Sequence, residues 1–355
     1  MPKKIGIVLV NYKDYAQRFL ASCRDSLRAQ DYPKEAINIY IVDNASNATS
    51  AEYLKNNFIE AAILPRLDGN YAAANNLGFQ AAIKDGCEYL VTVNMDTEMP
   101  PDWLSELAKA LDSNPRAGIA QSKVLLYPKT EAERAEPRIN SLGNVIHFLG
   151  FGFASGYGEP DRPIEGYPEI KGYASGCSFI IRAAIFQMVG AYNEELYMYH
   201  DDMEISLKVR LAGYKIILAP ASVIFHKYEF SRSVSMIYYM ERNRYLMMLS
   251  FYPTYLLFLI ALPAFVMDLG MLLYSVLKGW FKTELRVYAY FIRPDIYLKI
   301  EAEKKKIRNL NAIRFSTLAR DFSGRIEFQE IATPVLQYIV SPLFNLYWRI
   351  ITKII

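Results

Sequence analysis

The chain has 355 residues, which suffices for one large domain with an appendage or for two domains. Hydrophobic residues make up 52% of it and aromatic residues 14%, which excludes an intrinsically disordered chain. Residues 236–355 contain 16 basic and 9 acidic side chains, which gives a net charge of +7. Residues 1–235 contain 24 basic and 28 acidic side chains, which gives a net charge of −4. Because the basic residues of the second part flank long apolar runs, anionic lipid is a better partner for it than nucleic acid.

The cysteines are odd in number, far apart and form no CxxC pair; they are Cys23, Cys87 and Cys177. This pattern indicates buried thiols in a reducing compartment and argues against a zinc site. The first residues lead straight into an apolar run, with no signal peptide ahead of it. We therefore expect the front domain to stay in the cytosol.

A strand, a helix and a second strand are predicted within the first 44 residues. Ile5–Val10 and Ile37–Val42 are apolar runs typical of buried parallel strands, and apolar residues recur at helical spacing over residues 15–29. In such sheets ligands bind beyond the carboxyl ends of the strands. The polar residues at these ends are Asn11, Asp43 and Asn44. Ordinary turn chemistry is the alternative explanation for Asp43 and Asn44.

Two further segments carry candidate ligand contacts. An alanine-rich helix after residue 70 contains Asn75 and Asn76, which helix propensity does not favour, and its small residues allow close packing against a strand or a ligand. The buried strand Tyr89–Val93 ends at Asn94 and Asp96. A carboxylate just past a central strand can hold a divalent cation against phosphate oxygens. The alternative for Asp96 is a turn residue that caps the next helix.

The middle of the chain is less regular. Residues 118–122 are a further candidate strand, and residues 128–168 are rich in Gly, Pro and charge with little periodicity. We interpret the latter as a long excursion over the site, a kind of segment that usually carries specificity, and we expect residues 123–172 to determine acceptor choice. His147 has no partner nearby in the sequence and is interpreted as structural.

An acidic helix is predicted to begin at Asp201. Apolar residues recur every four positions from Met203 to Leu211, and Gly213 supplies a left-handed stop. Asp201 and Asp202 thus lie at the helix start, where the dipole favours an ionised carboxylate that can accept a proton from a bound hydroxyl. The alternative is an ordinary N-cap with solvated acids in the first turn.

Short elements flank this acidic helix. A strand at Phe179–Ile181 and a helix at Ala183–Val189 precede it, and two short strands at Ile216–Leu218 and Ser222–Phe225 follow it. The second of these ends at His226, a further candidate metal ligand.

The motifs occur in a familiar order: Asn11-Tyr12, Val-Asp-Asn-Ala-Ser at 42–46, Asn75-Asn76-x-Gly78, Asn94-x-Asp96-Thr97, Gly176-Cys177, Asp201-Asp202-x-Glu204 and His226. Over residues 5–245 this resembles the family 2 glycosyltransferases, closest to the rhamnosyltransferase-like branch that builds surface polysaccharides. The resemblance implies an α/β fold of the GT-A type, with a Rossmann-like mixed sheet flanked by helices. It also implies an inverting transfer from a nucleotide-diphosphate sugar, such as dTDP-rhamnose or another hexose donor, to a hydroxyl of a lipid-linked glycan.

The resemblance also implies roles by position. Asp43 would contact the nucleotide base, Asp96 would hold Mg²⁺ or Mn²⁺ on the diphosphate with help from His226, and Asp202 would be the catalytic base. The remaining predicted contacts to the nucleotide sugar are Asn11, Asn44, Asn75, Asn76, Asn94 and Asp201. Two positions depart from the family pattern: Asn94 replaces the first acid of the metal motif, and Asp201 replaces a glutamate.

Two other functions remain open from the sequence. A nucleotidyltransferase would use a similar sheet, but it usually carries a glycine-rich basic loop after its first strand, and residues 11–14 contain no glycine. A catalytically inactive scaffold subunit that binds sugar nucleotides is compatible with Asn94 and the shifted acidic cluster, although the intact Asp202 argues against it.

Residues 1–235 are predicted to form the GT-A domain, and residues 236–355 a helical, basic and apolar region associated with the membrane. Residues 245–277 contain a single charged residue, Asp268, and are long enough to span a bilayer. Prolines interrupt residues 245–277, and a single span would place the basic residues 304–308 on the non-cytoplasmic side of the membrane, against the positive-inside rule. We therefore favour helices that lie in the cytoplasmic leaflet. Residues 331–348 are a weaker second span, and an apolar dimer interface is the alternative.

Overall fold

The structure is a computed structural model that describes residues 2–227, 234–326 and 334–355. It divides into two compact units. The first consists of Met1–Asn144, Ala154–Val209 and Tyr214–Glu229, and the second of Val145–Phe153, Arg210–Gly213 and Phe230–Ile355. The predicted functional division at residue 235 stays a prediction.

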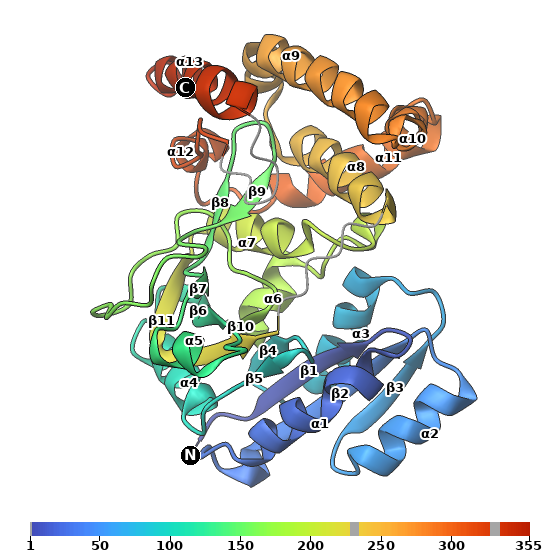
Figure 1. The fold of residues 1–355 in the computed structure, drawn as a ribbon, viewed down its shortest axis with the longest axis vertical. Helices are drawn as coiled ribbons and strands as arrows, with labels where there is room; N and C mark the ends of the chain where they lie inside the picture. The colour runs from blue at the N-terminus through green and yellow to red at the C-terminus, as the bar shows by residue number, and fades with distance from the viewer. Residues whose placement is uncertain (1, 228–233, 327–333) are drawn as a thin grey trace. The chain divides into compact units, whose positions relative to one another are not determined.

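A mixed sheet forms the centre of the first unit (Figure 1). Among the described residues its strand order is β3-β2-β1-β4-β10-β6-β11-β5, with β7 paired to β6. β1, β2, β3 and β4 are mutually parallel, and β10 runs antiparallel to both β4 and β6. The strands are β1 (Ile5–Asn11), β2 (Ile37–Asn44), β3 (Ala62–Arg66), β4 (Tyr89–Val93), β5 (Thr97–Glu98), β6 (Ala117–Leu126), β7 (Ile139–Ser141), β10 (Ser178–Arg182) and β11 (Lys215–His226).

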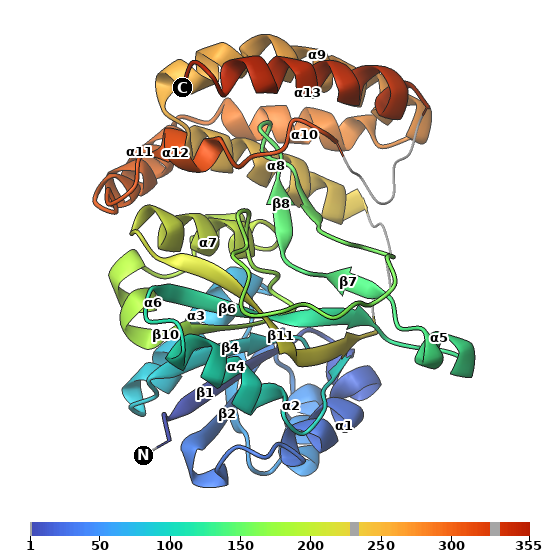
Figure 2. The ribbon, with the colours of Figure 1, turned by 90° about the vertical axis from the view of Figure 1, so that its left-hand side faces the viewer.

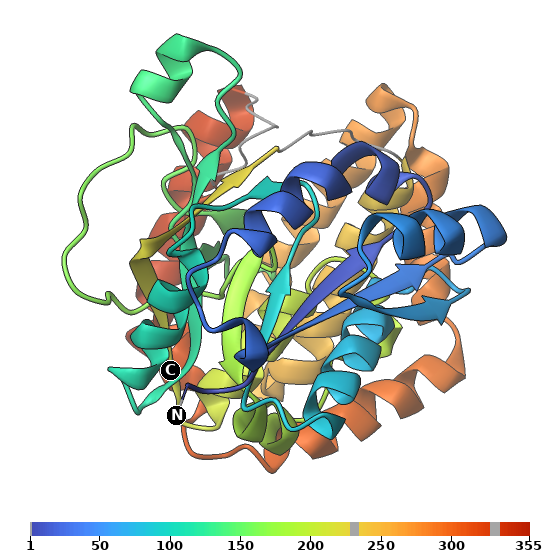
Figure 3. The same ribbon diagram turned by 90° about the horizontal axis from the view of Figure 1, so that it is seen from below.

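Helices cover both faces of this sheet, which explains why β1 is apolar throughout. Ile5, Ile7 and Leu9 belong to a core shared with helices α1 (Tyr15–Arg28), α2 (Ala48–Asn57) and α4 (Trp103–Asp112). The alternate residue Val8 faces α3 (Tyr71–Lys84), where a Cβ on Gly78 would lie 2.5 Å from Val8 Cγ1. Figure 3 shows α1 and α3 on opposite faces. The small residues of α3 therefore allow close packing against the sheet.

Several sequence-based boundaries are confirmed and others are corrected. Tyr89–Val93 and the helix α6 (Ala183–Val189) have their predicted bounds. The two strands predicted after the acidic helix are wrong as separate elements, because they form one strand, β11, with an irregular register between Ala219 and Val223. Pro220 falls within that irregular stretch, where the loss of a backbone donor is tolerated. The sequence-based prediction had no counterpart for α2 or β3.

The excursion at residues 128–168 contains short elements that are too brief to show a periodicity. They are α5 (Glu131–Ala135), β7 (Ile139–Ser141), β8 (Asn144–Ile146) and β9 (Gly152–Ala154), and β8 pairs with β9. His147 is fully buried, and its ring lies 4.5 Å from that of Phe148. Burial lowers the pKa of His147 to about 3, so the imidazole is neutral. These contacts support the structural interpretation of His147.

The second unit consists mainly of helices (Figure 2). They are α8 (Val234–Phe251), α9 (Thr254–Lys278), α10 (Phe281–Phe291), α11 (Pro294–Arg308), α12 (Phe315–Ala319) and α13 (Ser341–Ile351). Within the described ranges, α9 is long and apolar enough to cross a membrane by length and composition. Pro253 is its N-cap residue and Pro263 lies inside it.

Asp268, the lone charge of the apolar run, has a partner in this unit. Arg244 on α8 donates from Nη2 to Asp268 on α9 and to Glu241 one turn earlier on its own helix, each at 2.9 Å. Arg244 is almost wholly buried at 1% exposure, so both carboxylates are needed to offset its desolvation. Asp268 therefore connects two helices, which the sequence alone did not indicate.

Candidate active site

The first group of polar residues lies where β1 and β2 end. Asn11 and Asp43 are register partners on these parallel strands, and the Asn11 side-chain amide donates to Asp43 Oδ1 at 2.7 Å. The Ser50 hydroxyl donates to Asp43 Oδ2 at 2.6 Å from the first turn of α2. Asp43 is fully buried, so both of its oxygens are held in fixed directions with lone pairs remaining for a ligand.

Ser50 was not recognised from the sequence, although a signal for it exists. Asn47 and Ser50 form a capping box, in which each side chain accepts from the backbone N–H of the other. The spacing Asn-x-x-Ser is visible in the sequence and predicts the start of α2. That the same hydroxyl reaches Asp43 depends on the position of α2 beside β2. Asn44, the next residue of β2, is buried, and its Oδ1 has no hydrogen-bond partner within the described parts of the chain.

The second group connects Asp96 with the last residue of β11. His226 pairs with Thr97 across the short antiparallel contact of β11 with β5, and its Nε2 lies 3.2 Å from Asp96 Oδ2. The opposite ring nitrogen, Nδ1, lies 3.1 Å from the Asn140 side-chain oxygen on β7. Asn140 fixes the orientation of the imidazole, and no local sequence signal marked it.

The donor set around Asp96 fits a hard divalent cation. Burial lowers the pKa of His226, but the Cys177 sulfur and the Asp96 carboxylate outweigh it and raise this pKa to about 10. A cation bound at Asp96 would compete with that proton for the imidazole. Asp96 Oδ1 is buried and has no hydrogen-bond partner in the described ranges. Within those ranges no group of three or more His, Cys, Asp or Glu could hold a metal alone, so a cation here would also need substrate oxygens.

The third group lies at the start of α7 (Asp201–Leu211). The Gly176 backbone N–H donates to Asp202 Oδ2 at 3.1 Å, and the Met203 N–H donates to Oδ1 at 2.8 Å. Burial raises the pKa of Asp202 to about 6, although these two N–H groups act in the opposite direction. Burial and the neighbouring Asp202 raise the pKa of Asp201 well above its usual range. Of the two, Asp202 is the carboxylate that is ionised at neutral pH.

The backbone before α7 is strained. Tyr197, Tyr199 and His200 have φ angles of 64°, 64° and 62°, in the left-handed region that residues with side chains rarely adopt. The carbonyl of Tyr197 accepts from the N–H of Tyr71 at 2.7 Å at the start of α3, which holds the segment in place. Such strain is typical of functional sites, and sequence reasoning did not detect it.

The other predicted contacts are used mainly within the protein. The Asn76 amide donates to the Tyr192 carbonyl and accepts from the Tyr192 N–H, so it fixes the loop ahead of α7. The Asn75 amide donates to the Tyr71 carbonyl in its own helix. Asn94 accepts from the Tyr71 hydroxyl at 3.3 Å. Their roles as ligand contacts stay predictions.

Glu204, the third acidic residue in the first turn of α7, has a different role from Asp201 and Asp202. Glu204 forms a buried ion pair with Lys208 one turn later on α7, and both side chains are about 1% exposed. An acid paired in this way neutralises a buried cation and is unavailable as a base. Arg210 is paired with Asp321 at 2.8 Å, within the second unit.

All three groups lie at one edge of the sheet. Asp43 lies at the carboxyl end of β2 and Asp96 follows that of β4, and Gly176 precedes β10, whose first residue, Ser178, pairs with Val93 at the end of β4. His226 ends β11, which is parallel to β6 and therefore to β4. The tertiary fold thus brings together residues that are up to 215 positions apart, from Asn11 to His226.

A family model described as glycosyl transferase family 2 matches residues 5–187, which is more than half of the chain. The chain belongs to glycosyl transferase family 2. The matched range contains Asn11, Asp43 and Asp96, whereas Asp202 and His226 lie beyond it. The predicted family is therefore confirmed, and the assignment of the acidic helix stays a prediction.

Three curated relatives align with part of this chain. An O-antigen biosynthesis protein of Myxococcus xanthus is 28% identical over 246 residues, covering 65% of this chain and 18% of that protein. An N-acetylglucosaminyl-diphospho-decaprenol L-rhamnosyltransferase of Mycobacterium tuberculosis is 22% identical over 256 residues, covering 64% of this chain and 76% of that protein. An uncharacterised protein of Sinorhizobium fredii is 34% identical over 174 residues, covering 46% of this chain and 17% of that protein. The chain spans less than a fifth of the length of two of these relatives.

The solved structure of GalNAc-T7 with UDP, GalNAc and Mn²⁺ matches with a TM-score of 0.54 at 16% identity. The match covers 71% of this chain and 49% of that chain. At this identity the similarity shows the fold alone, and it confirms the predicted GT-A type of mixed sheet flanked by helices.

Proposed function

We propose that this glycosyltransferase moves a sugar from a nucleotide-diphosphate donor, dTDP-rhamnose or another hexose donor, to a hydroxyl of a lipid-linked glycan in the synthesis of cell-surface polysaccharide. The names of the two relatives above support the donor and acceptor classes. The observation that carries the proposal is the gathering of Asp43, Asp96 and Asp202 at one edge of the sheet. An inverting transfer requires a site for the nucleotide base, a site for the cation and a group that accepts the proton of the attacking hydroxyl.

The donor would bind along this edge. Asp43 would accept a hydrogen bond from the nucleotide base, because Asn11 and Ser50 hold its oxygens in place. Asp96 and His226 would hold Mg²⁺ or Mn²⁺, which would neutralise the charge that develops on the leaving diphosphate. Asn44, with its unpartnered buried oxygen, is the further contact that the geometry supports best.

Asp202 would act as the general base. Its carboxylate would take the proton of the acceptor hydroxyl, and the freed oxygen would attack the anomeric carbon. The bond from that carbon to the diphosphate breaks on the opposite side, so the configuration inverts. A pKa of about 6 keeps this carboxylate ionised at neutral pH and more basic than an exposed aspartate.

The second unit would associate with the cytoplasmic face of the membrane. α9 exposes large apolar side chains at helical spacing, among them Phe258, Leu262 and Phe265, at 77%, 69% and 64% exposure. Basic residues cluster at the end of α11, which favours anionic lipid. We propose that these helices lie in one leaflet rather than span the bilayer.

A nucleotide-release assay on detergent-purified protein tests the activity. dTDP-, UDP- and GDP-sugars are supplied with and without Mg²⁺ or Mn²⁺, and wild type is compared with Asp96→Ala and with the exposed control Asp102→Ala. Metal-dependent release from one donor, lost only in Asp96→Ala, supports the proposal. Donor binding without any transfer to a lipid-linked acceptor would favour the inactive scaffold, and release of pyrophosphate from a nucleoside triphosphate with a sugar phosphate would favour a nucleotidyltransferase.

A further inference from the structure

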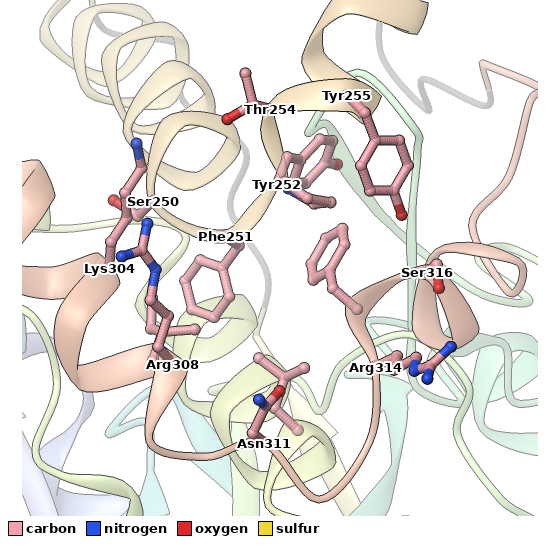
Figure 4. Close-up of a pocket in the computed structure, with 14 residues that line it drawn as sticks. Ser250, Phe251, Tyr252, Thr254, Tyr255, Lys304, Arg308, Asn311, Arg314 and Ser316 are labelled. Atoms are coloured by element: carbon pink, nitrogen blue, oxygen red, sulfur yellow. The ribbon is translucent and has the colours of Figure 1, made fainter.

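The second unit contains a pocket that the proposed reaction does not use (Figure 4). It has a volume of about 430 Å³ and lies where α8 ends and α9 begins, with the end of α11 and the start of α12 as its other walls. Its polar lining includes Ser250, Thr254, Lys304, Arg308, Arg314 and Ser316. No acidic side chain is among the described residues that line it.

Two of the three basic side chains in this pocket form no ion pair in the described part of the chain. Lys304 pairs with Glu301 at 2.8 Å, but Arg308 and Arg314 form no ion pair within the described ranges. Figure 4 shows Arg308 beside Lys304 on one wall and Arg314 on another, with Phe251 between them. The positive charge of two exposed arginines at the rim of the pocket favours an anionic ligand, and each guanidinium group can donate two parallel hydrogen bonds to acceptor oxygens.

The start of α9 also suits a phosphate group. α9 begins at Thr254 without a side-chain cap, so its first backbone N–H groups and the positive end of its dipole lie at the wall. These backbone donors are independent of the arginines.

An apolar surface continues directly from the pocket. Tyr255 is a pocket residue and is 48% exposed, and Phe258 and Leu262 follow it on α9 at the spacing of one helix face. A ligand with a phosphate in the pocket could therefore lay a hydrocarbon chain along α9. A free phosphate would use the donors but not this face.

We infer that the pocket binds the phosphate group of a lipid whose hydrocarbon chain lies along the exposed face of α9. The inference rests on the membrane association in the proposed function and specifies its chemistry. Arg308 and Arg314 supply the charge, the start of α9 supplies backbone donors, and the α9 face supplies the apolar contact. The binding is non-covalent and makes the second unit selective for phosphorylated lipid.

The test measures binding in two ways on the full-length protein. In detergent, titration with short-chain phosphatidic acid is compared with titration with inorganic phosphate. In flotation, phosphatidylcholine vesicles are compared with vesicles that also contain phosphatidic acid. The variant Arg308→Gln/Arg314→Gln is matched with Lys282→Gln/Lys353→Gln, which removes two exposed charges outside both the pocket and the basic end of α11, and circular dichroism confirms that both fold.

We expect the arginine variant to bind short-chain phosphatidic acid at least about tenfold more weakly, because each arginine contributes charge-assisted bonds. The lysine variant should stay within about twofold, because neither of its lysines lines the pocket. Equal affinity in both variants would overturn the inference, and equal affinity of inorganic phosphate and the lipid would assign the pocket to a free anion instead. Flotation on pure phosphatidylcholine reports on the membrane association separately, because its phosphate is a diester in a headgroup without net charge, whereas phosphatidic acid offers an anionic phosphate monoester.

Discussion

The side-chain amide of Asn11 donates a hydrogen bond of 2.7 Å to Oδ1 of Asp43. The two residues are the last register partners of the neighbouring parallel strands β1 and β2, so this side-chain bond joins the ends of the two strands. The Ser50 hydroxyl holds the other oxygen of Asp43. A carboxylate fixed from two sides is preorganised, which lowers the conformational entropy that the site itself loses when a ligand binds.

Replacing Asp43 with asparagine should weaken nucleotide binding while the fold is kept. The introduced amide can still accept from Asn11 and donate to Ser50, because a serine hydroxyl serves as donor or acceptor. The charged acceptor offered to the nucleotide base is lost, so we expect the affinity for the nucleoside diphosphate to fall roughly ten- to a hundredfold. Calorimetric titration checks this, with the exposed Asp31→Asn as control. Unchanged affinity would show that the base binds elsewhere.

Asp202→Asn should abolish transfer and leave donor binding intact. Loss of a general base typically costs roughly 10²–10⁴-fold in rate. Because burial raises the pKa of Asp202 to about 6, the wild-type rate should rise with pH and reach half its plateau near pH 6. The rate rises with pH because the general base must be ionised, and the carboxylate is protonated below this pKa. A rate that is flat between about pH 5 and 7 would contradict the role of Asp202.

Asn140→Ala should weaken cation binding although Asn140 does not contact the cation site directly. Its oxygen lies 3.1 Å from His226 Nδ1 and orients the imidazole whose Nε2 faces Asp96. Residues that orient a metal ligand typically contribute roughly 10–100-fold to affinity or activity. Titration of Mn²⁺ by electron paramagnetic resonance, in the presence of nucleoside diphosphate, measures the change. Asn38→Ala, which removes an asparagine bonded to Tyr40 on β2, should leave the Mn²⁺ affinity unchanged.

Two glycine substitutions in helices should change stability in opposite directions. A Cβ at Gly78 would lie 2.5 Å from Val8 in the core, so Gly78→Ala should destabilise the first unit by about 1–3 kcal/mol through overpacking. Gly270 lies inside α9, and in the described part of the chain a Cβ there would have no neighbour within 4 Å apart from the adjoining backbone of its own helix, so Gly270→Ala should stabilise the second unit by roughly 0.5–1 kcal/mol. Thermal unfolding of both variants checks the pair. A stabilising Gly78→Ala would mean that α3 does not pack as described.

The sequence alone determined the elements that local patterns encode. A continuous apolar run marks a strand buried on both faces, so β1 and β4 were predicted, and helical spacing with a glycine stop marked α7 and its end near Gly213. The ends of parallel strands lie at one edge of a sheet, so the site could be placed there from Asn11, Asp43 and Asp96. The order of these motifs also indicated the family.

Only the tertiary structure decided which side chains meet. Ser50 on Asp43, Asn140 on His226 and Gly176 on Asp202 are contacts between segments whose separation in the chain carries no periodic signal. The left-handed backbone at Tyr199 and His200 and the partner of Asp268 likewise depend on neighbours from distant elements. A local sequence pattern indicates which residues of an element face the core, because the burial of apolar side chains produces that pattern. The partner and direction of a side-chain hydrogen bond, by contrast, are fixed only when the elements have packed together.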